Sequence, residues 1–159
     1  MTANERTGWR DKEISARHRK WGFNCPAVDL DFLMVEYNMG KPVGLVEYKM
    51  YKSSMILNLK HATYRALKSL ADSAKIPFFV AYYYPDIWAF KVVTVNEYSK
   101  TWYENKIYTE KQYVEILYKI RSKTIEDVVY SKLNNRLPEK MLNSRYKKNT
   151  DKCKGLDEF

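Results

Sequence analysis

Three charged side chains stand at the ends of a predicted β-hairpin. Asp31 lies near the start of an apolar run that we expect to form a strand over residues 27–37. Glu47 and Lys49 close a second apolar run, expected to form a strand over residues 43–50. Folding this hairpin brings two carboxylates and an ammonium group to one end of an otherwise apolar ribbon. Charges gathered in this way favour a metal site over a solvated surface.

The register of the hairpin follows from its turn, which Asn38–Lys41 supplies. An antiparallel register centred near Met39 pairs Asp31 with Glu47, Leu33 with Leu45, Val35 with Val43, and Asp29 with Lys49. Two carboxylates at a cross-strand distance of about 5 Å repel each other unless a cation or a proton lies between them. Lys49 offsets part of that repulsion, and a divalent metal offsets more of it.

Oxygen ligands from Asp and Glu suit a hard ion, so the expected cofactor is Mg²⁺, with Mn²⁺ able to substitute. Such an ion lowers the pKa of a bound water and stabilises charge on a phosphodiester. Lys49 is expected on the same side as Glu47, where it can orient the attacking water or neutralise the developing charge. The aspartate ligand stays open between Asp29 and Asp31, and Asp31 is preferred because it pairs with Glu47.

These elements resemble the PD-(D/E)xK nuclease superfamily, whose restriction-endonuclease-like fold is shared by restriction enzymes, archaeal-type Holliday-junction resolvases and many phage and repair nucleases. The resemblance covers about residues 10–95. It consists of a first helix, an Asp-bearing strand, a turn, Glu47-Tyr48-Lys49, an amphipathic helix and a further strand. The proline–aspartate pair of the motif is absent, since the chain reads Pro26-Ala-Val-Asp29.

The resemblance implies metal-dependent hydrolysis of nucleic-acid phosphodiesters, with Asp31 and Glu47 as metal ligands and Lys49 as the catalytic lysine. Some members add a glutamate from the first helix, and Glu13 is the candidate by position. We therefore expect a Mg²⁺-dependent nuclease, acting on DNA in phage or bacterial recombination, repair or restriction. DNA versus RNA and endonuclease versus exonuclease action stay open.

The charge of the chain favours a polyanionic partner, with nucleic acid first. The 159 residues carry 28 Lys and Arg against 19 Asp and Glu, a formal net charge of +9. The first 50 residues are almost balanced, with 8 basic and 7 acidic side chains, so the surplus lies mostly after the hairpin. The candidate nucleic-acid contacts are Arg17, Arg19, Lys20, Lys52, Arg65 and Lys68. For each of them, an ordinary solvated surface is the alternative.

Two other function classes fit the same composition. A non-catalytic nucleic-acid-binding or assembly module on the same fold accounts equally well for the basic charge and the 15% aromatic content. A structural protein whose C-terminal helices bind a protein partner is the third reading. Tyr82, Tyr83 and Tyr84 can stack on bases, although a role in the sheet is the better interpretation. His61 is a weak candidate for a general base.

The remaining pattern predicts an α/β fold, a mixed β-sheet flanked by helices with a helical C-terminal extension. We expect helices over residues 10–21 and 54–75, the second capped by Ser53 or Ser54. A short strand over Phe23–Cys25 is also expected. Later elements are predicted as strands over 76–84 and 88–95, followed by helices over 110–121 and 124–134.

One domain is expected, with residues 1–96 as the nuclease-like core and 97–159 as a helical region packed on it, ending in a loose basic tail. The helical region is a candidate for forming a homodimer. No apolar run reaches the roughly 18 residues that span a membrane. The first residues lack a signal-peptide core, so a cytoplasmic location is expected. Cys25 and Cys153 lack ligand spacing, which disfavours a zinc knuckle.

Overall fold

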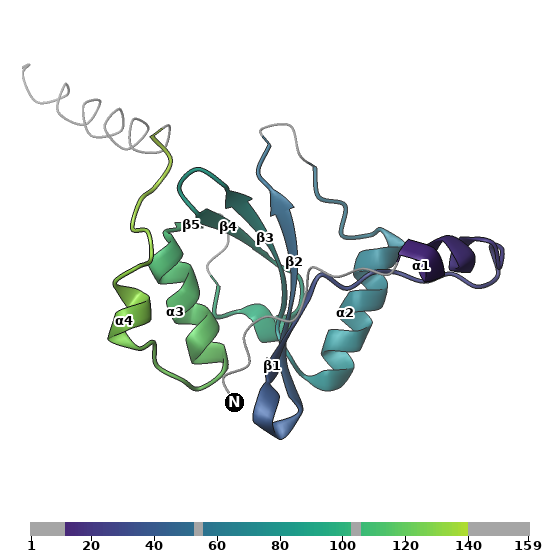
Figure 1. Ribbon diagram of the computed structural model, residues 1–159, viewed down its shortest axis with the longest axis horizontal. Coiled ribbons are helices and arrows are strands. Elements are labelled where there is room, and N and C mark those ends of the chain that lie inside the picture. The colour runs from purple at the N-terminus through teal and green to yellow at the C-terminus, as the bar shows by residue number, and fades with distance from the viewer. Residues whose placement is uncertain (1–11, 53–55, 103–105, 140–159) are drawn as a thin grey trace, which may run out of the picture.

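The computed structural model describes residues 12–52, 56–102 and 106–139 (Figure 1). Within them, the elements in chain order are α1 (Lys12–Arg19), β1 (Phe32–Glu36), η1 (Tyr37–Met39), β2 (Lys41–Met50), α2 (Ala62–Ala74), β3 (Phe78–Tyr84), β4 (Ala89–Thr94), η2 (Glu97–Ser99), β5 (Ile107–Tyr108), α3 (Glu110–Ile120) and α4 (Asp127–Tyr130). The strands form one sheet in the order β1-β2-β3-β4-β5. The β2–β3 pair is parallel and the other pairs are antiparallel, which confirms the predicted α/β class and mixed sheet.

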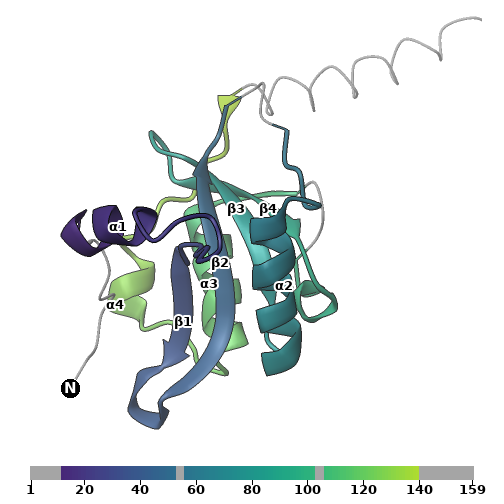
Figure 2. The same cartoon turned by 90° about the vertical axis from the view of Figure 1, so that its right-hand side faces the viewer.

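The sheet has a helix on each face, α2 on one and α3 on the other (Figures 1 and 2). On the α3 face, one buried cluster joins Tyr113 of α3 to Val46, Phe79, Ala81, Phe90, Val92, Trp102 and Tyr108. On the α2 face, a second buried cluster joins Leu67 and Ala71 of α2 to Leu45, Ile76 and Phe78. Because successive strand residues point to opposite faces, β2 places Glu47 and Lys49 on the α2 face and Tyr48 on the α3 face.

The β1–β2 register agrees with the prediction next to the candidate site. Phe32 pairs with Val46, Leu33 with Leu45 and Met34 with Gly44. The register then shifts between Met34 and Val35, so Val35 lies opposite Pro42 and the predicted pair of Val35 with Val43 is wrong. Proline has no N–H to donate to the ladder, and a bulge beside it is a common accommodation.

The β1 strand is also shorter than predicted, since it begins at Phe32. Asp29 therefore lies outside the ladder, and the predicted strand pair of Asp29 with Lys49 is not formed. Phe23–Cys25 forms turns and bends, not the expected short strand. The hairpin turn is a 3₁₀ turn that ends at Gly40, whose φ of 59° is left-handed.

Helix α2 begins later than the predicted start at residue 54. The Nδ1 atom of His61 accepts a hydrogen bond from the N–H of Thr63 at 3.3 Å and so caps the helix. Just before it, the side chain of Asn58 accepts from the N–H of Lys60, a local turn that competes with helix formation. The predicted caps Ser53 and Ser54 lie outside the described residues.

The other helices differ from prediction mainly in length. In α1, residues 12–19 are helical, and residues 10 and 11 lie outside the described part of the chain. Helix α3 matches its prediction closely and begins with a capping box of Thr109 and Gln112. Helix α4 covers only part of the predicted 124–134. The predicted basic tail lies outside the described residues, and within them no helix is long and apolar enough to cross a membrane.

Candidate functional site

Hydrogen bonds join Asp31 to β2 just beyond the end of the β1–β2 pairing, next to Glu47. The N–H of Asp31 donates to Oε1 of Glu47 at 3.3 Å, and Oδ2 of Asp31 accepts from the N–H of Tyr48 at 3.0 Å. This arrangement follows from the adjacent pair of Phe32 with Val46. In the same antiparallel register, the next residues along the two chains, Asp31 and Glu47, lie opposite each other. The two predicted carboxylates are therefore brought together by the backbone of the hairpin.

The carboxyl group of Glu47 is a buried acid in this pair. Only 8% of the residue is exposed. Burial raises the pKa of Glu47, and the nearby Asp31 carboxylate raises it further through its charge and a side-chain hydrogen bond. The backbone N–H of Asp31 and the charge of Lys49 lower it, but the net direction is upward. A bound proton or a bound cation would therefore stabilise this buried carboxyl group.

Lys49 lies between the two carboxylates and helix α2. A side-chain hydrogen bond with Tyr64 raises the pKa of Lys49, and the charges of Glu47 and Asp31 raise it further, while burial lowers it. The Nζ atom lies 5.8 Å from the centre of the Tyr64 ring. These contacts keep the side chain a cation at neutral pH and hold it on the α2 face.

Two tyrosines complete this group of side chains, which we call the α2-face cluster (Asp31, Glu47, Lys49, Tyr64 and Tyr82). Tyr82 pairs with Lys49 across the parallel β2–β3 ladder and is 7% exposed. Burial raises the pKa of Tyr82, the neighbouring Tyr64 raises it further, and Lys49 lowers it. The buried position of Tyr82 confirms its interpretation as a sheet residue.

The role of Tyr64 was not predicted from the sequence. Its spacing from Leu67 and Ala71, three and seven residues later, is the helical spacing that puts it on their stripe. Leu67 and Ala71 are the buried residues of α2, so this stripe faces the sheet. The sequence carries that signal, but it does not show that Lys49 is what Tyr64 meets.

Asp29 and Glu13, the less certain metal ligands, lie elsewhere. Asp29 lines a hollow of about 290 Å³ beside α1, together with Ile14, Ser15, His18, Arg19 and Ala27. Glu13 lies on α1, which has no buried residue. Among the residues that the structure describes, no three His, Cys, Asp or Glu side chains gather closely enough to hold a metal ion. The structure thus joins Asp31 with Glu47 and does not add Asp29 or Glu13 to them.

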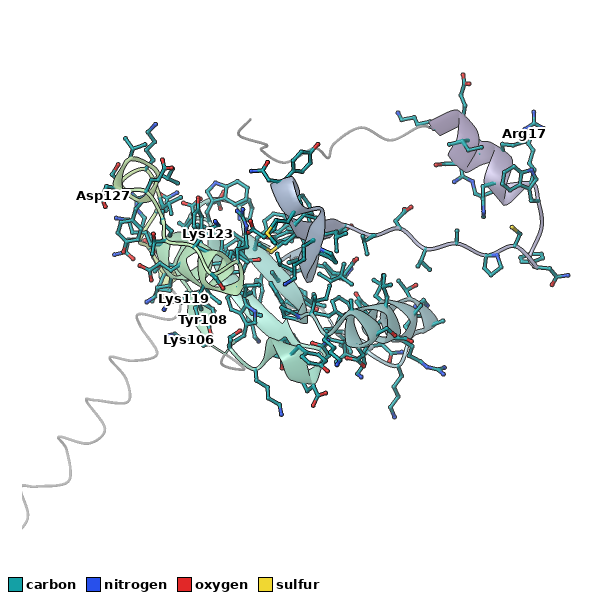
Figure 3. All side chains as sticks on the ribbon, turned by 90° about the horizontal axis from the view of Figure 1, so that it is seen from below. Arg17, Lys106, Tyr108, Lys119, Lys123 and Asp127 are labelled. Carbon is teal, nitrogen blue, oxygen red and sulfur yellow. The ribbon has the colours of Figure 1, made fainter. Side chains whose placement is uncertain are left out.

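The predicted nucleic-acid contacts fall on three separate segments. Arg17 and Arg19 lie on α1, which projects away from the sheet, and exposed Lys20 follows it (Figure 3). Arg65 and Lys68 are exposed on α2, where Lys68 forms an ion pair with Asp72. Exposed Lys52 lies just beyond the end of β2, close in sequence to Lys49.

A second hollow lies far from these residues in the fold. It measures about 450 Å³ and is lined by Glu115, Tyr118, Lys119, Lys123, Thr124, Ile125, Asp127 and Tyr130. Figure 3 shows Lys119, Lys123 and Asp127 grouped at α3 and α4, on the side opposite Arg17. Its lining mixes acids and bases and includes none of the α2-face cluster.

Comparison with known proteins finds no matching family model, no matching curated protein and no matching solved structure. The donor set fits a hard divalent cation, because two carboxylates converge and one of them is buried where an uncompensated anion is unfavourable. A cation bound there would relieve both the repulsion and the cost of burial.

Proposed function

We propose that the protein is a metal-dependent nuclease that hydrolyses phosphodiester bonds in nucleic acid, with DNA favoured. The observation that carries this proposal is the pair of backbone hydrogen bonds that joins Asp31 to Glu47 and Tyr48, with Lys49 next to them on the same face. This arrangement supports the resemblance to the PD-(D/E)xK superfamily in its three charged positions. The formal charge of +9 supports a polyanionic substrate.

Each residue of the cluster has a role that follows from its chemistry. Asp31 and Glu47 would hold Mg²⁺, or Mn²⁺ in its place. When bound, the ion supplies a water of lowered pKa and positive charge at the scissile phosphate. Lys49 stays protonated and stabilises the negative charge that develops on the phosphate oxygens. Tyr64 positions the Lys49 ammonium group by its side-chain hydrogen bond.

The test is a cleavage panel on single-stranded, duplex and branched DNA and on RNA, each in Mg²⁺, in Mn²⁺ and in chelator. We expect cleavage in the metal buffers and none in chelator. Glu47→Gln should abolish it, because the amide removes a charged ligand while keeping the size of the side chain. Glu36→Gln is the matched control, since Glu36 pairs with Arg121 instead of taking part in the cluster.

Two outcomes contradict the proposal. Cleavage that survives in Glu47→Gln would assign the activity to other residues or to a contaminant. Metal-independent binding of nucleic acid with no cleavage of any substrate would favour the non-catalytic binding module instead.

A further inference from the structure

A pair of stacked tyrosines continues the row of side chains that runs along β2 from Glu47 to Lys49. The N–H of Tyr51 donates to the carbonyl of Tyr83 at 2.9 Å, so the β2–β3 pairing persists beyond the end of β2. By alternation, Tyr51 and its neighbour Tyr84 on β3 lie on the same face as Lys49. Their ring centres are 4.4 Å apart and their planes meet at 22°.

This stacked pair is partly exposed and lies close to positive charge. Tyr51 is 39% exposed, so part of its ring is available to a ligand. Lys49 lies two residues back along the strand, roughly 7 Å away, and exposed Lys52 follows directly. An exposed aromatic ring flanked by cations is the combination that binds an unpaired nucleotide, because the base stacks and the phosphate meets the ammonium groups.

A third exposed ring at the same end of the sheet belongs to the other face. Trp88 lies in the β3–β4 turn, and Figure 1 shows this turn at the same end as the end of β2. Its φ is 52°, in the left-handed region that favours glycine, and its N–H donates to the carbonyl of Tyr84 at 2.7 Å. The ring stacks on Tyr83 at 5.9 Å, yet 45% of the residue is exposed. Because Tyr83 packs on the α3 face, the Trp88 ring lies on that face of the sheet, opposite to Tyr51 and Tyr84.

We propose that this aromatic platform (Tyr51 and Tyr84) binds unpaired bases of a nucleic-acid strand. It directs the site to single strands, frayed ends or flaps. The binding step stands on the rings and lysines alone, whereas its consequence for cleavage rests on the proposed nuclease function. A duplex offers the platform little, because its bases already stack on one another, whereas an unpaired base has a free face.

The experiment measures binding in chelator, where no metal-dependent cleavage can interfere. Fluorescence anisotropy follows a labelled single strand of roughly twelve thymidines, a length within the range of known single-strand sites. A labelled duplex of equal length is measured alongside at the same salt concentration. We expect the single strand to bind more tightly. Tyr51→Leu and Tyr84→Leu should each weaken it by about tenfold, while changing duplex binding little.

Matched controls come from exposed aromatic residues away from the platform. Tyr37 is 45% exposed at the opposite end of the hairpin, and Trp21 is 54% exposed beyond α1. Tyr37→Leu and Trp21→Leu should leave single-strand binding unchanged. Thermal unfolding of all four variants separates lost binding from lost folding. Equal affinity for single strand and duplex, or equal losses in platform and control variants, would overturn the proposal.

The two proposals fail in different ways. If platform variants bind normally while Glu47-dependent cleavage persists, the platform is wrong and the nuclease function stands. If the single strand binds through Tyr51 but nothing is cleaved in Mg²⁺ or Mn²⁺, the platform stands and the nuclease function fails.

Discussion

Replacing Glu47 by glutamine should stabilise the metal-free protein at neutral and alkaline pH. Burial and the Asp31 carboxylate raise the pKa of Glu47 above its ordinary value of 4.5. The folded protein then binds a proton more tightly than the unfolded chain does. Stability contributed by this group is present below pH 4.5 and is lost as pH rises toward the folded pKa. Glutamine is neutral at every pH and avoids that loss.

The magnitude follows from linkage. One proton held in the folded state and released in the unfolded state gives a slope of at most about 1.4 kcal/mol per pH unit. Solvent that reaches the carboxylate screens it and makes the slope smaller. The free energy of unfolding of the wild type should therefore fall across the window that starts near pH 4.5, relative to that of Glu47→Gln. Above the folded pKa, the difference between the two proteins should be constant.

The assay is urea unfolding of both proteins from pH 3 to 8 in chelator, followed by circular dichroism. Glu36→Gln is the control of opposite sign. A hydrogen bond with Arg121 lowers the pKa of Glu36, so its stabilisation is present above pH 4.5 and is lost as pH falls through the folded pKa. Parallel pH profiles for the wild type and Glu47→Gln, or a less stable Glu47→Gln at pH 8, would refute the reasoning.

Three further predictions concern single residues. Lys49→Met should reduce Mg²⁺-dependent cleavage by about a hundredfold or more, measured at saturating substrate, because a positive charge at the phosphate is lost; a milder loss would argue against its catalytic role. Trp88→Gly should be more stable than Trp88→Ala by about 1 kcal/mol in thermal unfolding, because the backbone there is left-handed; the usual preference for alanine would refute this. Tyr113→Phe should cost about 1–2 kcal/mol, because the Tyr48 hydroxyl loses its partner at 2.8 Å; an unchanged urea midpoint would show that the bond contributes nothing.

The sequence predicted the hairpin near the site because two apolar runs flank a short turn. The pairs from Phe32 to Met34 follow the predicted register, and this is enough to face Asp31 with Glu47. The shift at Val35 was not predicted, because alternation of apolar residues does not show where a ladder accommodates Pro42.

The predicted start of α2 was wrong for a similar reason. Apolar spacing continues upstream of Ala62, but Asn58 bonds to the backbone in a turn before the helix, and His61 caps the helix at its start. Tyr64 was missed because periodicity gives the stripe of a helix and not the strand residue that it meets. Side-chain partners across elements depend on packing that a single sequence does not display.

The central claim is that Asp31 and Glu47 hold a catalytic metal beside Lys49. The most direct measurement is Mg²⁺-dependent cleavage of a labelled single strand by wild type and Glu47→Gln, at equal protein concentration, with Glu36→Gln alongside. We expect the wild type and Glu36→Gln to cleave the strand in Mg²⁺ but not in chelator, and Glu47→Gln not to cleave it at all. Equal cleavage by Glu47→Gln and the wild type, or cleavage that persists in chelator, would contradict it.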